Sequence, residues 1–492
     1  MPAYDQEQET AICNKVMVSH EVGRLRRLLV HSPDSGLGKV TPSKAQDWLF
    51  EDIVHLDTMR RDEYDYFTKL LLYFLDPDRV AGKLAAIDDP INRRNFYKPG
   101  HPQFHGSDRV VEIQQLLTEL LQDEVVRTKL VASICAVENV SYSVQEALLM
   151  MDATLLGRTL ISGTTPDDKR MIFAPIPNLI FARDVGIVIN DHILLNKPAR
   201  QARMREALIM KYIFFNHPYF ESCRRRVIEL ADSKHHFLHH DKDVDYKHVT
   251  LEGGDFMMVA PNHLVVGISE RTTAYAVNQV IKAVFDRELV DKVSVIRIPK
   301  KRDYMHIDTV FTQVRRDCWV LLGSLSKRGV ELETREFYRT LAEEALPNHE
   351  LKIWQFEREK EGKTKEFAYL EDLLTDISQN DLGVEGEVAF VYSGNNEYPF
   401  GDREQWTDSC NLLALREGVV VGYDRNDKTA EAFRNVGFDV IDAAELLHHF
   451  EIGMLTPDAV TNTLIMLPSA ELSRARGGSR CMSMPLWREA PE

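Results

Sequence analysis

Residues 248–269, HVTLEGGDFMMVAPNHLVVGIS, contain two short apolar runs separated by the dipeptide Pro261-Asn262. Short apolar runs bounded by turn residues are typical of buried β-strands, and Asn readily adopts turn conformations. A helical pattern follows, in which apolar residues recur on one face. These are Val277, Val280, Ile281, Val284 and Phe285. The segment therefore predicts a strand–turn–strand–helix unit.

The same unit recurs elsewhere in the chain. Three further copies are PNLIFARDVGIVINDHILLN (177–196), HIDTVFTQVRRDCWVLLGSL (306–325) and SCNLLALREGVVVGYDRN (409–426). Helices are expected after them near 199–215, 335–345 and 429–438. A strand expected at 24–31 would belong to a diverged fifth copy. Because one such unit cannot bury its own apolar face, the copies must pack against one another, either stacked or in a ring.

Residues 43–157 have a different character from these repeats. The composition of 59–75 is helical, and from residue 113 apolar residues recur with the spacing of an amphipathic helix. Between them, 88–103 is rich in Pro, Asn and Arg and is expected to be a loop. We therefore expect 1–42 and 158–492 to form a catalytic domain, with 43–157 as a mainly helical inserted module.

Composition narrows the classes of partner. The 60 basic and 76 acidic residues give a net charge of −16 without a dense basic patch, so nucleic-acid binding is not expected. The six cysteines form no CxxC pair, which argues against a zinc ribbon or a disulfide framework. Neither a signal peptide nor a membrane span is recognisable. We expect a cytoplasmic homo-oligomer with no membrane partner.

Acidic residues stand at the start of the entering strand in several copies. They are Asp184, Glu252 with Asp255, Asp308 and, just ahead of its strand, Asp408. In a stacked array they would form a spaced row, whereas in a closed ring they would converge on one pocket. Convergent carboxylates repel one another, so such a pocket should hold a cation. We therefore favour the ring.

Near the C-terminus, RARGGSRCMSMPL (474–486) places Cys481 beside Arg476 and Arg480. Neighbouring cations are expected to favour its thiolate, although a free cysteine is as often a small buried apolar residue. A guanidinium pairs with carboxylates, a thiolate can attack its carbon, and His306 could transfer protons. This scheme needs no metal and no cofactor. Three histidine pairs do not change that expectation, because their spacing fixes no ligand geometry. They are His235-His236, His239-His240 and His448-His449.

Several motifs, taken in order, resemble those of the arginine deiminase family in the guanidine-modifying (pentein) superfamily. They are PNLIFARD, LEGGDFMMV, HIDTVF, WTDSCNLLALREGVVVGYDRN and RARGGSRCMSMPL, and the opening stretches VSHEVGRLRRLLVHSPD and WLFEDIVHLD also match. The resemblance implies a five-bladed α/β propeller with an inserted helical domain. It also implies hydrolysis of L-arginine to L-citrulline and ammonia through a covalent amidino-thioether.

The same resemblance assigns roles by motif. It implies that Cys481 is the nucleophile, that His306 and Glu252 transfer protons, and that Asp184 and Asp308 hold the guanidinium. Other positions would contact the rest of the substrate. They are Arg200, Arg271 and Arg476 at the α-carboxylate, Asn178 at the amino-acid end and Phe181 along the aliphatic stem.

Two departures from the family pattern leave alternatives open. Ala182 replaces a threonine, and extra residues near 358–380 and 451–467 could reshape the entrance to the site. The alternatives are an amidinotransferase, a hydrolase of agmatine or methylated arginine, and a catalytically silent arginine-binding protein. Agmatine lacks a carboxylate, so it would leave the three arginines without a partner.

Overall fold

The computed structural model describes residues 15–50, 52–92, 94–231, 249–327, 351–360 and 362–491. Within these residues the strands form five separate sheets in a mixed α/β fold. In each sheet, two strands pair antiparallel, and one of the two also pairs with a third strand that runs parallel to it. The predicted helix near 335–345 lies outside the described residues.

Some of the five sheets combine strands that are distant in the chain. The strands of the first are β18 (Met484–Arg488), β1 (Leu25–Val30) and β2 (Val110–Glu112), and those of the second are β3 (Gly186–Ile189), β4 (His192–Leu195) and β5 (Val227–Ile228). The third contains β6 (Phe256–Ala260), β7 (His263–Ile268), β8 (Lys292–Arg297), β11 (Lys352–Glu357) and β12 (Lys363–Phe367). The fourth contains β9 (Phe311–Arg315), β10 (Cys318–Leu321) and β13 (Ala389–Tyr392), and the fifth contains β14 (Leu413–Arg416), β15 (Val419–Tyr423), β17 (Thr463–Leu467) and β16 (Asp439–Asp442).

The hairpins turn where the sequence predicts. Asn190, between β3 and β4, has φ 50°, and Gly418, between β14 and β15, has φ 73°. Asn and Gly tolerate this left-handed region at low cost. The strands on either side are almost entirely buried, which agrees with their apolar runs.

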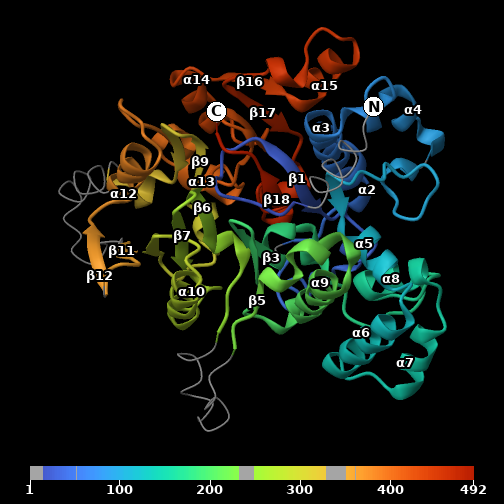
Figure 1. The fold of residues 1–492 in the computed structure, drawn as a ribbon. Coiled ribbons are helices and arrows are strands. Elements are labelled where there is room, and N and C mark those ends of the chain that lie inside the picture. Colours follow the sequence, from blue (N-terminus) through green and yellow to red (C-terminus); the bar gives the residue numbers. More distant parts are fainter. Residues whose placement is uncertain are drawn as a thin grey trace, which may run out of the picture.

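Helices cover the sheets and form most of the region between β1 and β3. They are α2 (Leu56–Thr58), α3 (Asp65–Leu75), α4 (Leu84–Ile87), α5 (Ile113–Leu120), α6 (Glu124–Val137), α7 (Tyr142–Leu149) and α8 (Ala153–Ser162). Later helices are α9 (Met204–Asn216), α10 (Ala274–Asp286), α12 (Leu370–Asp376), α13 (Phe400–Trp406), α14 (Asp427–Asn435), α15 (Ala443–Glu451) and α16 (Leu472–Ala475). Figure 1 shows α5–α8 gathered at one side of the molecule, away from α12–α14.

The helical faces predicted from the sequence point into the core. In α10, Val277, Val280 and Val284 are buried. Complete burial of an aliphatic side chain of this kind contributes roughly 1.5–3 kcal/mol to stability. A π-helical turn, Met59–Tyr64, precedes α3 and places Glu63 and Tyr64 in the interior.

The two ends of the chain share one sheet. Strand β18 pairs antiparallel with β1, and β2, from the mainly helical region, pairs parallel with β1. Figure 1 shows β1 and β18 near the middle of the molecule. This pairing brings Cys481, three residues before β18, toward residues from the rest of the chain.

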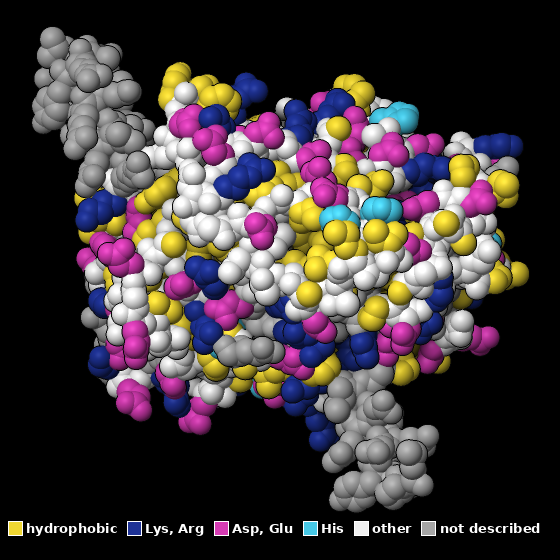
Figure 2. Space-filling view, turned by 90° about the horizontal axis from the view of Figure 1, so that it is seen from above, with side chains coloured by type: hydrophobic (Ala, Val, Ile, Leu, Met, Phe, Trp, Pro, Cys, Tyr) yellow, Lys and Arg dark blue, Asp and Glu magenta, His cyan; other side chains and the backbone are white. Residues whose placement is uncertain are grey.

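Charged side chains of both signs are mixed on one face of the molecule. Figure 2 shows Lys and Arg side chains interspersed with Asp and Glu over the face that it presents. Among the helices of the described ranges, none is both long and apolar enough to cross a membrane.

Candidate active site

A cavity of about 500 Å³ gathers most of the residues singled out in the sequence. Nine of the ten predicted site residues line it. They are Asn178, Phe181, Asp184, Arg200, Glu252, Arg271, His306, Arg476 and Cys481. The tenth, Asp308, is not among the lining residues, but its Oδ2 lies 3.9 Å from the Cys481 sulfur. Residues more than 300 positions apart in the sequence therefore share one site.

Short 3-10 turns before the strands position the polar side chains. Asp184 lies in the turn Ala182–Val185 before β3, and Glu252 directly precedes the turn Gly253–Asp255 before β6. His306 likewise precedes the turn Ile307–Thr309, which leads to β9. Each unit thus delivers its side chain at the same structural position, the entrance of its first strand.

Two glycines allow these turns to approach closely. A Cβ atom on Gly253 would lie 2.0 Å from the Arg183 carbonyl oxygen, and one on Gly254 would lie 2.6 Å from His306 Nδ1. Side chains at these positions would therefore push apart the segments that carry Asp184, Glu252 and His306.

His306 is held between carboxylates. Its Nε2 lies 3.1 Å from Glu252 Oε2, and its Nδ1 lies 4.0 Å from Asp184 Oδ1. Burial alone would lower the pKa of His306, but Asp184 and Glu252 raise it to about 10. Burial would raise the pKa of Glu252, but Arg203 and His306 hold it well below its usual range. The imidazole is therefore protonated at neutral pH and can donate a proton.

Sequence reasoning missed Arg203, which is buried beside this group. Its Nη1 donates to Asp184 Oδ2 at 2.7 Å and to Glu252 Oε2 at 3.3 Å, and its Nε donates to Glu206 Oε2 at 2.9 Å. Burial would lower the pKa of Arg203, but Glu206, Asp184 and Glu252 raise it well above its usual value. The three-residue spacing between Arg203 and Glu206 was the available signal.

The same cluster has the composition of a metal site. Asp184, Glu252 and His306 offer ligand atoms that lie within 4.8 Å of one another. However, Arg203 already donates to both carboxylates, and a protonated imidazole has no lone pair for a metal. The donor set therefore fits an ion-pair network better than a metal centre.

The expectation that neighbouring arginines make Cys481 a low-pKa thiolate is wrong, because burial and nearby carboxylates outweigh the effect of Arg480. The side chain is only 6% exposed, and burial raises the pKa of its thiol well above the usual value, as do Asp308, Asp184 and Asp408. Arg480 opposes this shift. However, its Nη1 donates to Asp308 Oδ2 at 2.7 Å and its Nε donates to Glu21 Oε2 at 3.1 Å, so its charge is balanced. Proximity in sequence therefore did not predict the electrostatic surroundings of the sulfur.

Two buried carboxylate oxygens near the sulfur lack a hydrogen-bond partner among the described residues. They are Asp308 Oδ1 and Asp408 Oδ2. Burial raises the pKa of Asp408 to about 7, while Arg476 lowers it. A cation entering the cavity would supply the missing partner and lower the pKa of Cys481.

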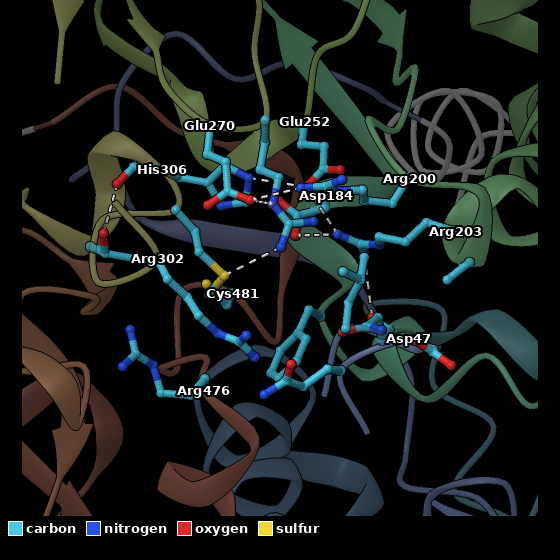
Figure 3. Close-up of a pocket in the computed structure, with 18 of the residues that line it drawn as sticks. Asp47, Asp184, Arg200, Arg203, Glu252, Glu270, Arg302, His306, Arg476 and Cys481 are labelled. Atoms are coloured by element: carbon cyan, nitrogen blue, oxygen red, sulfur yellow. Dashed lines mark hydrogen bonds and ion pairs between the residues drawn. The ribbon is translucent and has the colours of Figure 1, made fainter. Parts of the chain in front are cut away.

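The predicted carboxylate-binding arginines differ in their surroundings. Arg200 is exposed over 56% of its side chain and pairs with Glu270 at 3.2 Å, whereas Arg271 and Arg476 are buried. The Arg476 guanidinium stacks 3.5 Å from the centre of the Trp406 ring. In Figure 3, Cys481 lies between the Asp184–Glu252–His306 group and Arg476. Asp184 and Glu252 therefore lie on one side of the sulfur, which we call the acidic side, although Arg203 pairs with both carboxylates and Arg200 lies near them.

The loop before β18 is fixed at several points. The Cys481 backbone N–H donates to Asn411 Oδ1 at 2.9 Å, and the Tyr423 hydroxyl donates to the Gly477 carbonyl at 2.7 Å. A Cβ on Gly477 would lie 2.3 Å from the Phe181 ring. These contacts hold the sulfur in a defined position.

A buried thiol, a protonated imidazole and two carboxylate oxygens without partners among the described residues define an enzyme site for a cationic substrate. Residues 161–488 match the family model described as arginine deiminase, and the chain belongs to that family. It is 29% identical to an arginine deiminase of Staphylococcus aureus (strain JH9) over 490 residues, covering 96% of this chain and 98% of that protein. Identity to the arginine deiminase of strain Newman is 28%, with the same coverage.

Solved structures resemble this one only distantly. SxtG, an amidinotransferase from Microseira wollei, is 12% identical, with a TM-score of 0.45 and coverage of 96% of this chain and 98% of that one. The N-terminal domain of ArgZ, an arginine dihydrolase from Cyanobacteria, is 13% identical, with a TM-score of 0.36 and coverage of 63% and 76%. Neither TM-score is high enough to assign the arrangement of the sheets.

Proposed function

We propose that this enzyme hydrolyses L-arginine to L-citrulline and ammonia, with Cys481 as the nucleophile. The single observation that carries the site assignment is the cavity that joins a buried thiol, a protonated histidine and carboxylates. Membership of the arginine deiminase family, and 28–29% identity over nearly the whole chain, support the reaction. A volume of about 500 Å³ suits a single amino acid.

The guanidinium would bind at the acidic side of the cavity. Asp184 and Asp308 would accept its N–H groups, and Asp308 Oδ1 is unpaired. A carboxylate pairs well with a planar guanidinium, because the two can form parallel hydrogen bonds. The substrate's positive charge would offset the carboxylates that raise the pKa of Cys481, so the thiolate would form when the substrate is present.

The first half-reaction forms a covalent bond. The Cys481 thiol releases its proton to solvent as the substrate binds, and the thiolate attacks the guanidinium carbon to give a tetrahedral adduct. His306 then donates a proton to the departing nitrogen, the carbon–nitrogen bond breaks, and ammonia leaves behind an amidino-thioether. Glu252, 3.1 Å from the His306 Nε2, holds the imidazole in place and stabilises its charge.

The second half-reaction returns the free thiol. His306, now neutral, accepts a proton from water, whose oxygen attacks the same carbon. The carbon–sulfur bond breaks, and citrulline is released as Cys481 and His306 recover their protons. Arginine and water are thereby converted to citrulline and ammonia without another reactant.

The α-carboxylate of the substrate would contact arginines that line the cavity. Arg271 and Arg476 are buried among the lining residues and suit a carboxylate, and Arg200 is more exposed. Asn178 and Phe181 line the same cavity beside the expected path of the amino-acid end and stem. These positions favour arginine over agmatine, which has no carboxylate.

The five sheets would be the blades of an α/β propeller, with the region 43–157 inserted between 1–42 and 158–492. The support is that every sheet contains an antiparallel pair of strands, one of which also pairs with a third, parallel strand. The entrances of their first strands also supply residues to one cavity, and these are Asp184, Glu252, His306, Asp408 and Cys481. A cytoplasmic location would keep the thiol reduced. Assembly into a homo-oligomer remains a prediction, which light scattering of the purified protein would test.

The decisive test is an assay of the purified protein for citrulline and ammonia from arginine without added metal. Wild-type protein should form both, and Cys481→Ala should form neither while remaining folded. Mass analysis of the quenched reaction should find the amidino adduct on the peptide that contains Cys481. Comparable turnover of agmatine or dimethylarginine, or transfer to an added amine, would replace this function with one of the alternatives.

A further inference from the structure

A buried carboxylate from the mainly helical region caps the helix that leads to the catalytic cysteine. Glu63 lies in the π-helical turn Met59–Tyr64 and is 1% exposed. Its Oε1 accepts a hydrogen bond from the Glu471 N–H at 2.7 Å, and its Oε2 accepts one from the Leu472 N–H at 2.6 Å. Both carboxylate oxygens are therefore used at the first turn of α16, more than 400 residues away in the sequence.

Helix α16 runs directly into the site. Its C-terminal neighbour is Arg476, in the left-handed conformation with φ 64°, followed by Gly477 and, four residues later, Cys481. The contacts that fix this loop from the other direction come from Tyr423 and Asn411. A displacement of α16 would consequently move Arg476 first and strain the contacts of the cysteine loop.

The same part of the chain also forms a wall of the cavity. Asp47 and Leu49 line it, and the Trp48 carbonyl accepts a hydrogen bond from Asn178 Nδ2 at 2.6 Å. Residues 47–50 and 52–63 thus contact both the substrate cavity and the start of α16. Glu63 provides the buried link between the two.

Other contacts at α16 are more exposed. The Arg474 guanidinium pairs with Asp52 at 2.8 Å, with 39% and 54% of their side chains exposed. Exposed ion pairs contribute little, because solvent screens them and ordering two long side chains costs entropy. Hydrogen bonds that a buried carboxylate accepts from backbone N–H groups are stronger, so Glu63 contributes more to the attachment than this exposed pair does.

We propose that Glu63 is a positioning residue for the reaction, which acts through α16 to hold Arg476 and Cys481 in their catalytic arrangement. The proposal rests on the function proposed above. Burial raises the pKa of Glu63 to about 6, while the bonds from Glu471 and Leu472 lower it. The nearby carboxylates of Glu471 and Asp424 raise it further. Because this pKa is raised, ionised Glu63 lowers the stability of the folded protein at neutral pH. Such a cost is expected of a residue whose role is to position other groups.

The test compares Glu63→Gln with wild type and with Asp52→Asn, which removes the exposed pair on the same segment. In Glu63→Gln, one oxygen is replaced by an NH2 group that faces a backbone N–H, so one of the two hydrogen bonds is lost. We expect kcat/KM for arginine to fall about tenfold or more. Asp52→Asn should stay within twofold of wild type. The Tm of Glu63→Gln should stay within a few degrees of wild type or rise.

Two further readouts separate positioning from general damage. Amide hydrogen exchange of a peptide spanning 469–476 should accelerate in Glu63→Gln, with the sheets unchanged. The ratio of wild-type to Glu63→Gln kcat/KM should also approach one as the pH falls from 7.5 to 5, because wild-type Glu63 then becomes protonated. Wild-type kinetics in Glu63→Gln, unchanged exchange at 469–476, or a pH-independent ratio would overturn the proposal.

If Glu63→Gln does not fold, Glu63→Asp serves in its place. This variant keeps the charge but is one methylene shorter, so the same loss of kcat/KM and faster exchange are expected to a smaller degree. Wild-type enzyme and Cys481→Ala are assayed in the same series. Absence of citrulline from the wild type would refute the proposed function, whereas an active wild type with a fully active Glu63 variant refutes only the role of Glu63.

Discussion

The His306 Nε2 atom lies 3.1 Å from Glu252 Oε2, and both side chains are buried. This contact joins the entrances of two different sheets, at β6 and β9. Asp184 and this contact together raise the pKa of the imidazole to about 10, although burial alone would lower it. The proton-donating state of the site therefore depends on carboxylates from two other strand entrances.

Replacing Glu252 with Gln should disable the proton donor. The variant preserves shape but removes one of the charges that raise the pKa of His306. We expect kcat to fall about 10²- to 10³-fold, within the range found for general acid–base groups. Steady-state kinetics from pH 6 to 9 would measure the fall in kcat. The pH optimum of the residual activity should move to lower pH, because the pKa of His306 is lower in the variant. A variant with wild-type kcat at pH 8 would contradict this role.

The same pair should give stability a characteristic pH dependence. The folded-state pKa of His306 is about 10, above the ordinary value of 6.5. Its contribution to the free energy of unfolding is therefore fully present below pH 6.5 and is lost as the pH rises through 10. Between pH 7 and pH 9.5, the free energy of unfolding measured in urea should fall more in wild type than in Glu252→Gln. Equal losses in both proteins would show that His306 is not responsible.

Asp308→Asn should make Cys481 more reactive in the absence of substrate. After burial, Asp308 is the largest influence raising the pKa of this thiol. Its removal also leaves the Arg480 guanidinium less fully balanced. We expect iodoacetamide to label Cys481 several-fold faster at pH 7.5, as measured by peptide mass analysis with buried Cys223 as an internal control. At the same time, arginine turnover should fall, because the guanidinium loses a partner. Slower or unchanged labelling would contradict the electrostatic account.

Gly254→Ala should damage the site sterically. The added Cβ would lie 2.6 Å from His306 Nδ1, so the imidazole or the turn must move. Such overpacking costs roughly 1–3 kcal/mol of stability, and activity should fall at least tenfold. Gly386→Ala is a matched control, since its Cβ would meet nothing within 4 Å. The free energy of unfolding and kcat would be measured for both variants. Equal changes in Gly254→Ala and Gly386→Ala would contradict the steric explanation.

Several features of the fold and the site could be predicted from the sequence, because they depend on the place of a residue within its own strand, turn or helix. Asp184, Glu252 and His306 each stand at the start of a strand, and a repeated unit places such positions equivalently. The apolar face of α10 and the turn at Asn190 also follow from local periodicity and turn chemistry. These expectations needed no knowledge of contacts between distant residues.

Other features depend on distant contacts and could not be predicted. Arg203 bonds to residues 19 and 49 positions away, so its role appears only once the units are packed together. The pKa of Cys481 was predicted in the wrong direction, because the charges of Asp308 and Glu21 that balance Arg480 are far away in sequence. The carboxylate of Glu63 likewise meets α16 only in the folded chain.

The arginines that line the cavity predict how the enzyme selects its substrate. Arg271 is buried, its Nη2 lies 3.6 Å from the Met305 sulfur and its Nε lies 3.9 Å from Glu270 Oε1, so a substrate carboxylate at hydrogen-bond distance would be a better partner than either. Arg271→Ala should lower kcat/KM for arginine about 10- to 100-fold, as expected for loss of a hydrogen bond to a charged group. Agmatine has no carboxylate, so its slow turnover should change by less than threefold.

Arg200→Ala provides the comparison for Arg271→Ala. The Arg200 side chain is 56% exposed and pairs with Glu270 at 3.2 Å. Arg200→Ala should therefore lower kcat/KM for arginine less than Arg271→Ala does. Measuring kcat/KM for arginine and agmatine in both variants separates recognition of the carboxylate from a general effect on the cavity. If Arg271→Ala lowered kcat/KM for arginine and agmatine equally, Arg271 would act on the shape of the site. The assignment of Arg271 to the substrate carboxylate would then be wrong.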